Sequence, residues 1–225
     1  MALQVFYGGT FDPVHEGHLS VAREVRDALG ARVNLVPAAD PPHKDITHAD
    51  ADARARMLDL AVAGEPGLKV DRRELRRAGP SYTADTLREL REQVGPDVPL
   101  VWLIGGDSLL KLHTWHRWRE LFDHAHVLAV ARPGAPLDPA EVAAQAPEVE
   151  GVIGPRRRPA SELNATPAGG FAVFPLRRER PESSTELRRR IAAGEAWEAG
   201  VPPAVAEYIR RRGLYVVRGV TSASL

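Results

Sequence analysis

Two histidines and a pair of glycines near the start of the chain have the types and the spacing for phosphate chemistry. The segment 8–18 reads GGTFDPVHEGH, with His15 and His18 three residues apart. Glycine lets main-chain amides approach an anion closely, and the first turn of a helix presents unpaired N–H groups with a partial positive charge. Two imidazoles there can donate hydrogen bonds to one phosphate group as charge builds on it. We therefore predict a phosphate site, the alternative being a glycine-rich turn with two ordinary surface histidines.

A second group of candidate residues lies in the segment 183–188, SSTELR. Serine and threonine are good N-caps, and Glu186 suits the positive end of a helix dipole. Arg188 lies one turn inside the helix, where a cation is disfavoured unless an anion compensates for it. The segment predicts a second phosphate contact, although taken alone it also fits a capped surface helix with a solvated arginine face.

These segments need a scaffold, and the apolar spacing predicts one in which strands and helices alternate. Strands are expected at 3–7, 33–36, 68–70, 100–104, 127–131 and 170–175. Helices are expected at 17–29, 51–63, 83–93, 139–145, 184–193 and 202–212, the last two closing the fold. The alternation predicts an α/β fold with a doubly wound, mainly parallel sheet, in which ligands bind beyond the carboxyl ends of the strands. The segment 8–18 follows the first strand and lies in that position.

Length and composition narrow the class of protein. The 225 residues suit a single domain over 1–218, with 133–181 as a variable connection inside it and 219–225 as a disordered tail. No apolar run approaches the length of a membrane span and no secretory signal is visible, so we expect a cytoplasmic protein with no membrane partner. The chain has no cysteine, which excludes disulfides and thiolate catalysis, and its net charge of zero argues against a nucleic-acid partner.

The segment 15–18, HEGH, resembles the (H/T)xGH signature of the adenylyltransferase superfamily, and 183–188 resembles the SSTxxR signature near the end of the same superfamily. The resemblance implies a Rossmann-like sheet and two histidines that bind and stabilise the triphosphate of ATP. It also implies that Ser183, Ser184 and Arg188 hold the ATP phosphates. Glu182 departs from the pattern, which has an apolar or small residue before the serines.

Four further segments are similar, in the same order, to bacterial nicotinate-nucleotide adenylyltransferases: 41–44 (PPHK), 80–87 (PSYTADTL), 104–108 (IGGDS) and 113–118 (HTWHRW). The similarity covers 8–132 and 183–215 and implies transfer of AMP from ATP to nicotinate mononucleotide, a step of NAD biosynthesis. The residues it implies at ATP are Gly8, Gly9, Thr10, Phe11, His18, Gly105, Asp107, Arg132, Ser183, Ser184 and Arg188. Those at the acceptor are Asp12, His15, Lys44, Tyr82, Thr83, Thr86, Trp115 and His116.

Several of these residues also have a direct physical interpretation. Lys44 can meet a phosphate, Trp115 can stack on a pyridine ring, and amides near Thr83 and His116 can receive a ring carboxylate. Taken singly, Trp115 also fits helix packing, Lys44 a solvated loop and Asp107 a helix cap.

The chemistry requires no nucleophilic side chain, because the acceptor brings its own phosphate oxygen. We expect the catalytic group to be His15, His18, Lys44 and Arg188, with Mg²⁺ bridging phosphate oxygens and no metal site built from protein side chains. Other residues are assigned to structure: Trp118, Tyr208, Leu214 and Tyr215 to packing, and the arginine triplets 156–158 and 210–212 to solvated surface.

Three alternatives stay open at this point. The acceptor could be nicotinamide mononucleotide or pantetheine phosphate, or the chain could be a non-catalytic nucleotide-binding module. A dehydrogenase is possible on fold alone, although the loop after the first strand lacks the spaced glycines of dinucleotide binding. The sequence also leaves open whether the chain forms a homo-oligomer.

Overall fold

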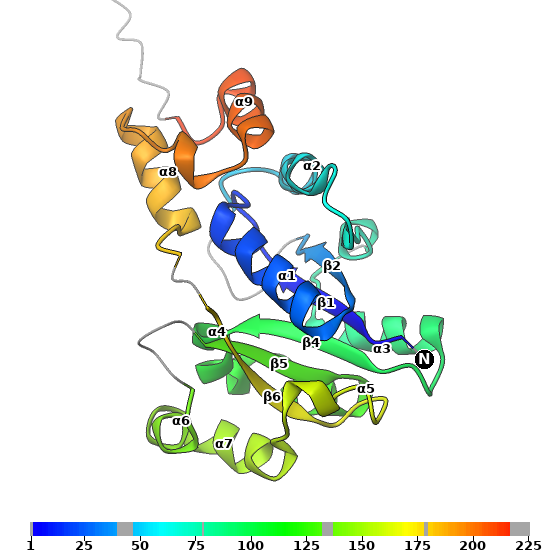
Figure 1. The fold of residues 1–225 in the computed structure, drawn as a ribbon. Coiled ribbons are helices and arrows are strands. Elements are labelled where there is room, and N and C mark those ends of the chain that lie inside the picture. The colour runs from blue at the N-terminus through cyan, green and yellow to red at the C-terminus, as the bar shows by residue number, and fades with distance from the viewer. Residues whose placement is uncertain (1, 40–46, 78, 132–136, 178–179, 217–225) are drawn as a thin grey trace, which may run out of the picture.

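The fold is seen in a computed structural model that describes residues 2–39, 47–77, 79–131, 137–177 and 180–216. Within these residues six strands form one sheet in the order β3-β2-β1-β4-β5-β6, and every neighbouring pair is parallel. The strands are β1 (Gln4–Gly9), β2 (Arg32–Pro37), β3 (Leu68–Val70), β4 (Leu100–Gly105), β5 (His126–Ala131) and β6 (Phe171–Pro175). The doubly wound α/β fold expected from the sequence is confirmed (Figure 1).

The α-helices connect the strands and close the fold. They are α1 (Glu16–Leu29), α2 (Ala51–Val62), α3 (Thr83–Val94), α4 (Gly106–Leu110), α5 (Leu121–His124), α6 (Pro139–Gln145), α7 (Pro147–Ile153), α8 (Ser184–Ala193) and α9 (Pro203–Arg212). Short 3₁₀ helices lie at Glu74–Arg76 (η1), Leu112–Thr114 (η2), Trp118–Glu120 (η3), Gly154–Arg156 (η4), Ala160–Glu162 (η5) and Glu198–Gly200 (η6). None of the helices in the described ranges has the length and apolar character needed to cross a membrane.

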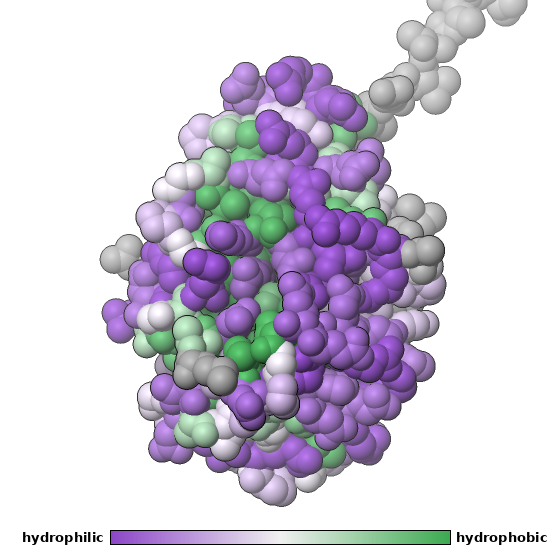
Figure 2. All heavy atoms as spheres, turned by 90° about the vertical axis from the view of Figure 1, so that its right-hand side faces the viewer, coloured by the Kyte–Doolittle hydropathy of each residue, from purple (hydrophilic) through white to green (hydrophobic). Residues whose placement is uncertain are grey.

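The sheet is buried on both faces, as a parallel sheet must be. Alternate residues of β4 show this: Val101 and Leu103 belong to a core cluster with α1, α2, α8 and α9, whereas Trp102 and Ile104 belong to a cluster with α3 to α7. Figure 1 shows α8 and α9 beside α1 and α2, on the side of the sheet opposite α3. Hydrophilic residues cover most of the face drawn in Figure 2, where apolar residues form a band between them.

The segment between β5 and β6 is more regular than the sequence indicates. The expected helix 139–145 and the expected strand 170–175 are present, but α7 was not predicted. The proline that opens α7, Pro147, fits the first helical turn, and Val149 and Ile153 are fully buried one turn apart. The prediction was wrong because the Pro-rich sequence was interpreted as a loop, although proline is compatible with a helix start.

The first arginine triplet, 156–158, is not solvated surface as expected. All three side chains are half-buried, and the guanidinium groups of Arg156 and Arg157 lie over the rings of Phe122 and Phe171, both at 5.1 Å from the ring centroid. Arg157 also pairs with Glu150 of α7 at 2.6 Å. The triplet therefore attaches the connecting segment to the core, whereas the residues 210–212 are exposed as predicted.

A buried histidine fixes the chain where β6 begins. His126 is fully buried, its Nδ1 accepts a hydrogen bond from the amide of Gly170 at 2.8 Å, and its Nε2 lies 2.7 Å from the carbonyl of Thr166. Because a main-chain N–H donates to Nδ1, the ring proton is on Nε2 and donates to Thr166. Burial lowers the pKa of His126, so the ring is held in its neutral form.

Candidate active site

The strand order reverses between β1 and β4, and the glycines of both motifs lie at the carboxyl ends of these two strands. A Cβ on Gly8 would lie 2.2 Å from Cζ2 of Trp102, and a Cβ on Gly9 would lie 2.8 Å from Cζ of Phe11. These glycines therefore let two aromatic rings pack directly against the end of β1. Gly105 ends β4 with nothing near its Cβ position, and Asp107 is exposed in the first turn of α4.

His15 and His18 cap the first helix for each other. The amide of His18 donates to Nδ1 of His15, and the amide of His15 donates to Nδ1 of His18, both at 3.3 Å. The two rings are stacked, with centroids 3.7 Å apart. In a capping box the side chains satisfy amides at the helix start, and here imidazoles do what serine and glutamate usually do. With both Nδ1 atoms accepting, each neutral ring carries its proton on Nε2, where it can be donated.

The ring of Phe11 packs against the His18 ring of this pair. It is a buried residue with a left-handed backbone, φ 52°, and its ring makes edge contacts with His18 at 5.0 Å and Tyr7 at 5.5 Å. A positive φ in a bulky residue is held only where the surroundings over-determine it, and such residues cluster at functional sites. The structure therefore uses Phe11 to fix the His18 ring.

The segment 183–188 docks on the loop that leads to the two histidines. Ser183 caps α8 by accepting a hydrogen bond from the amide of Glu186, as expected. Ser184 donates its hydroxyl to the carbonyl of Pro13 at 3.0 Å, and Arg188 donates from Nη1 to the carbonyl of Asp12 at 2.7 Å. Contacts between residues more than 170 positions apart thus bring the two predicted phosphate motifs together.

Two neighbours of this segment bear on its electrostatics. Glu182 points one carboxylate oxygen at Arg180, 3.7 Å away, and buries the other, which has no hydrogen-bond partner in the described part of the chain. The departure from the family pattern therefore leaves the Ser183 cap intact. Arg189 and Arg190 hold the pKa of half-exposed Glu186 at about 2, so these two arginines are engaged with Glu186, whereas Arg188 turns to the first motif.

Asp12 is a meeting point rather than an open carboxylate. It is buried, Oδ2 accepts from the amide of His48 at 2.8 Å, and Oδ1 accepts from the amide of Ala49 at 3.2 Å and from the hydroxyl of Tyr215 at 2.7 Å. With three protein donors on its two oxygens, the carboxylate holds the loop that precedes His15. Tyr215, assigned to packing from the sequence, has this specific polar contact in addition.

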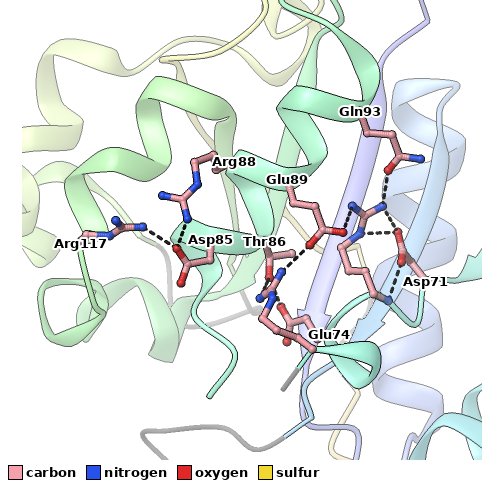
Figure 3. A network of polar contacts seen from close by, with 10 residues as sticks. Asp71, Glu74, Asp85, Thr86, Arg88, Glu89, Gln93 and Arg117 are labelled. Atoms are coloured by element: carbon pink, nitrogen blue, oxygen red, sulfur yellow. Dashed lines mark hydrogen bonds and ion pairs between the residues drawn. The ribbon is translucent and has the colours of Figure 1, made fainter. Parts of the chain in front are cut away.

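Four of the predicted acceptor residues lie at or near the start of α3. Tyr82 immediately precedes α3, and its ring lies 4.4 Å from the ring of His116, tilted by 36°. Arg117, which has φ 50°, donates to Asp85 of α3 at 2.7 Å and so ties the two loops (Figure 3). Thr83 opens α3, and Trp115 is half-buried against the core. The Tyr82–His116 contact thus brings the segment 82–83 beside the segment 115–116.

Thr86, which we predicted at the acceptor, is turned into the interior of the protein. Its side chain is fully buried, its Oγ1 donates to Glu74 at 2.7 Å, and Nη1 of Arg77 donates to it at 3.1 Å (Figure 3). Burial raises the pKa of Glu74, an effect that the hydrogen bond from Thr86 opposes. Thr86 lies on the helix face that carries Leu87 and Leu90 into the core, and this accounts for its burial.

One residue missed by the sequence analysis organises the loops around the site. Arg54 of α2 is fully buried, and its guanidinium donates to main-chain carbonyls of Thr10 (2.8 Å), Ala38 (2.6 Å), Ala39 (2.6 Å) and Ala49 (3.3 Å). A signal was available: Arg54 precedes Met57 and Leu58 by three and four positions, so it lies on the apolar face of the predicted helix.

Two predicted site residues, Lys44 and Arg132, lie outside the described residues, as does the tail 219–225. Within the described ranges, no three His, Asp or Glu side chains converge in a way that could hold a metal ion.

Comparisons with known proteins identify the family of the chain. A family model described as cytidylyltransferase-like matches residues 6–190. A relative from Stenotrophomonas maltophilia, described as "probable nicotinate-nucleotide adenylyltransferase", is 49% identical over 222 residues, covering 96% of this chain and 97% of its own. A relative from Marinobacter nauticus with the same description is 45% identical over 220 residues, covering 97% of this chain and 99% of its own.

Solved structures show the same fold. Nicotinic acid mononucleotide adenylyltransferase of Plasmodium falciparum, complexed with NaAD, gives a TM-score of 0.72 at 15% identity and covers 96% of this chain and 98% of its own. The same enzyme complexed with APC gives a TM-score of 0.69 with the same coverage. At this identity the likeness supports the fold alone, and the family assignment rests on the relatives from Stenotrophomonas maltophilia and Marinobacter nauticus.

Proposed function

The chain belongs to the nicotinate-nucleotide adenylyltransferase family, and on this premise we propose that it transfers AMP from ATP to nicotinate mononucleotide, giving nicotinate adenine dinucleotide and pyrophosphate. The observation that carries the proposal is the docking of the 183–188 segment on the loop before His15, through the contact of Arg188 with the Asp12 carbonyl. It supplies a guanidinium and two imidazoles at the strand ends where a nucleotide binds in this fold.

The reaction needs alignment and charge neutralisation. A phosphate oxygen of nicotinate mononucleotide forms a bond to the α-phosphorus of ATP, and the bond from that phosphorus to the leaving pyrophosphate breaks in line. The Nε2–H groups of His15 and His18 donate to phosphate oxygens as negative charge moves toward the leaving group, and Arg188 neutralises the triphosphate. No side chain forms a covalent bond to the substrate.

Mg²⁺ enters with ATP as part of the substrate. The buried carboxylate of Asp12 already accepts three hydrogen bonds from protein donors, and we expect phosphate oxygens and water to be the main ligands of the ion. Proposed further contacts to ATP come from the segment 8–11, from Gly105 and Asp107, and from Ser183 and Ser184.

The acceptor side is the group formed by Tyr82, Thr83, Trp115 and His116. Trp115 offers a ring for stacking on the pyridine, and first-turn amides of α3 suit the ring carboxylate, because they carry the positive end of the helix dipole. A negatively charged nicotinate gains from that dipole and a neutral nicotinamide does not, so we assign the acid form as the preferred acceptor.

The test is pyrophosphate release from ATP and Mg²⁺ with nicotinate mononucleotide, nicotinamide mononucleotide and pantetheine phosphate offered in parallel. We expect the largest kcat/KM with nicotinate mononucleotide. A larger value with another acceptor would keep the chemistry and overturn the acceptor assignment, and no release with any of the three would overturn the proposed function itself.

A further inference from the structure

The hydroxyl of Tyr215 reaches back over 203 positions to the first motif, where it donates to Oδ1 of Asp12 at 2.7 Å. Burial first, and the neighbouring Asp12 carboxylate second, raise the pKa of Tyr215 far above its usual range. Both effects favour the protonated phenol, which is the form that donates to Asp12.

The backbone is bent to make this contact. Helix α9 ends at Gly213, which is left-handed with φ 59°, and Tyr215 itself has φ 67°. A left-handed tyrosine is a strained residue, and strain of this kind persists where the surrounding contacts over-determine the geometry. The strain and the hydrogen bond are independent observations that point to the same residue.

Asp12 is bonded to three other segments of the chain, one of which carries Tyr215. The Asp12 carboxylate also holds the amides of His48 and Ala49, and its carbonyl holds Arg188. The guanidinium groups of Arg188 and Arg54 both act on the phenol, since each lowers the pKa of Tyr215 against the larger effect of burial. The Asp12 carboxylate, the Tyr215 hydroxyl and the two guanidinium groups thus form one cluster. It is centred on Asp12, which precedes His15 by three positions.

We propose that Tyr215 is a positioning residue for AMP transfer: by holding the Asp12 carboxylate, it fixes the orientation of the loop that carries His15 and of the Arg188 guanidinium bound to that loop. The inference rests on the proposed function. A phosphate donor misplaced by a fraction of an ångström loses its transition-state hydrogen bond more than its ground-state one, so the effect belongs in kcat.

The experiment compares two tyrosine-to-phenylalanine variants that each remove one hydroxyl. Tyr215→Phe deletes the donor to Asp12. Tyr208→Phe is the matched control, because Tyr208 is half-buried on α9 and its hydroxyl makes no hydrogen bond to the described residues. Initial rates of pyrophosphate release give kcat and the KM values for ATP and nicotinate mononucleotide, and thermal melts followed by circular dichroism report folding.

We expect Tyr215→Phe to lower kcat about tenfold or more, the size of a lost hydrogen bond to a charged group, with both KM values within about threefold of the wild type. Tyr208→Phe should leave kcat within about twofold. In an Asp12→Asn background, Tyr215→Phe should cost much less than in the wild type, because the two residues act as a unit.

Other outcomes would overturn the proposal. A Tyr215→Phe enzyme with wild-type kcat would do so, even if its melting temperature fell, because the hydroxyl would then serve stability alone. Equal losses in both variants, or an undiminished Tyr215→Phe effect in the Asp12→Asn background, would also sink it. If the wild-type enzyme itself released no pyrophosphate, the proposed function would fail, which is a distinct result.

Discussion

At the scale of single residues, the defining feature is that His15 and His18 complete each other. Each ring accepts the main-chain amide of the other residue, so the helix start, the tautomers and the ring stacking are one arrangement. Neither imidazole needs a carboxylate partner to direct its proton, because the backbone amides do this. The histidine pair is thus positioned by the same contacts that begin α1.

Removal of one member should damage the transition state. We expect His18→Ala to lower kcat about a hundred- to a thousandfold, as for other well-aimed donors, with a smaller change in ATP affinity. Single-turnover rates and ATP binding by calorimetry measure the two effects. His124→Ala, on α5 and away from the motif, is the control, and a His18→Ala enzyme with near-normal turnover would remove His18 from the catalytic group.

Arg54 supports a prediction about stability. Arg54→Met keeps much of the volume but leaves four carbonyls, those of Thr10, Ala38, Ala39 and Ala49, without their donor. Buried unpaired acceptors cost about 1 to 3 kcal/mol each, and relaxation recovers part of that, so we expect a loss of about 3 kcal/mol in the free energy of unfolding.

Urea denaturation measures this loss, and the same helix offers a control. Arg56 is exposed two positions away, and Arg56→Met should change the free energy of unfolding by less than about 0.5 kcal/mol. Equal effects of the two substitutions would show that the guanidinium contacts of Arg54 carry no special weight.

Prediction from sequence works for residues whose chemistry is local and fails for those whose role depends on distant segments. His15, His18 and Ser183 act within one turn of their own position, and the sequence identifies them as helix-start groups. Tyr215 and Arg54 act on residues 203 and 44 positions away. The residues next to a tyrosine or an arginine in the sequence do not indicate which distant carboxylate or carbonyl its side chain will contact.

At the scale of elements, the acceptor region depends on how α3 is held. Asp85 receives hydrogen bonds from Arg117 and from Arg88, at 2.7 and 2.6 Å, while Thr86 is turned into the interior (Figure 3). Thr83 and Thr86 were both predicted as acceptor contacts. Thr83 opens the helix, whereas Thr86, three residues later, is fully buried with Leu87. Only the first turn of α3 is left for an acceptor.

The connection into β6 should make stability depend on pH. Because the pKa of His126 is lowered in the folded state, the neutral ring is favoured there, and its contribution is complete above the unfolded pKa of 6.5. As the pH falls below 6.5, the unfolded chain takes up a proton that the folded chain resists, so the free energy of unfolding decreases.

His126→Gln keeps a donor toward Thr166 and removes this titration. Urea midpoints measured between pH 7.5 and 5 should therefore fall less steeply for the variant than for the wild type. Parallel pH profiles would contradict the assignment of this dependence to His126.

At the scale of the whole molecule, the predicted fold is largely confirmed, because a parallel sheet covered on both faces leaves a strong pattern of apolar strands and amphipathic helices. The six predicted strands and the two closing helices are present. The helix α7 was missed because proline marks both loops and helix starts, and the sequence does not distinguish the two uses without knowledge of the packing of Val149 and Ile153.

The two core clusters share the sheet, which leads to a prediction for the intact chain. Every central strand contributes to both clusters, so neither can be lost alone, and we propose that the region 1–218 unfolds as one domain. Far-ultraviolet circular dichroism and tryptophan fluorescence should give coincident urea transitions. Separate midpoints for the two probes would show that the chain contains two independently folding parts.

The return of residues 184–215 to the first motif has a consequence for biosynthesis. A nascent chain that has just completed β6 already holds every strand of the sheet, yet the Arg188 and Tyr215 contacts to Asp12 do not exist until translation has proceeded through α8 and α9. The contacts of Arg188 and Tyr215 with Asp12 therefore form only after all six strands of the sheet have been synthesised.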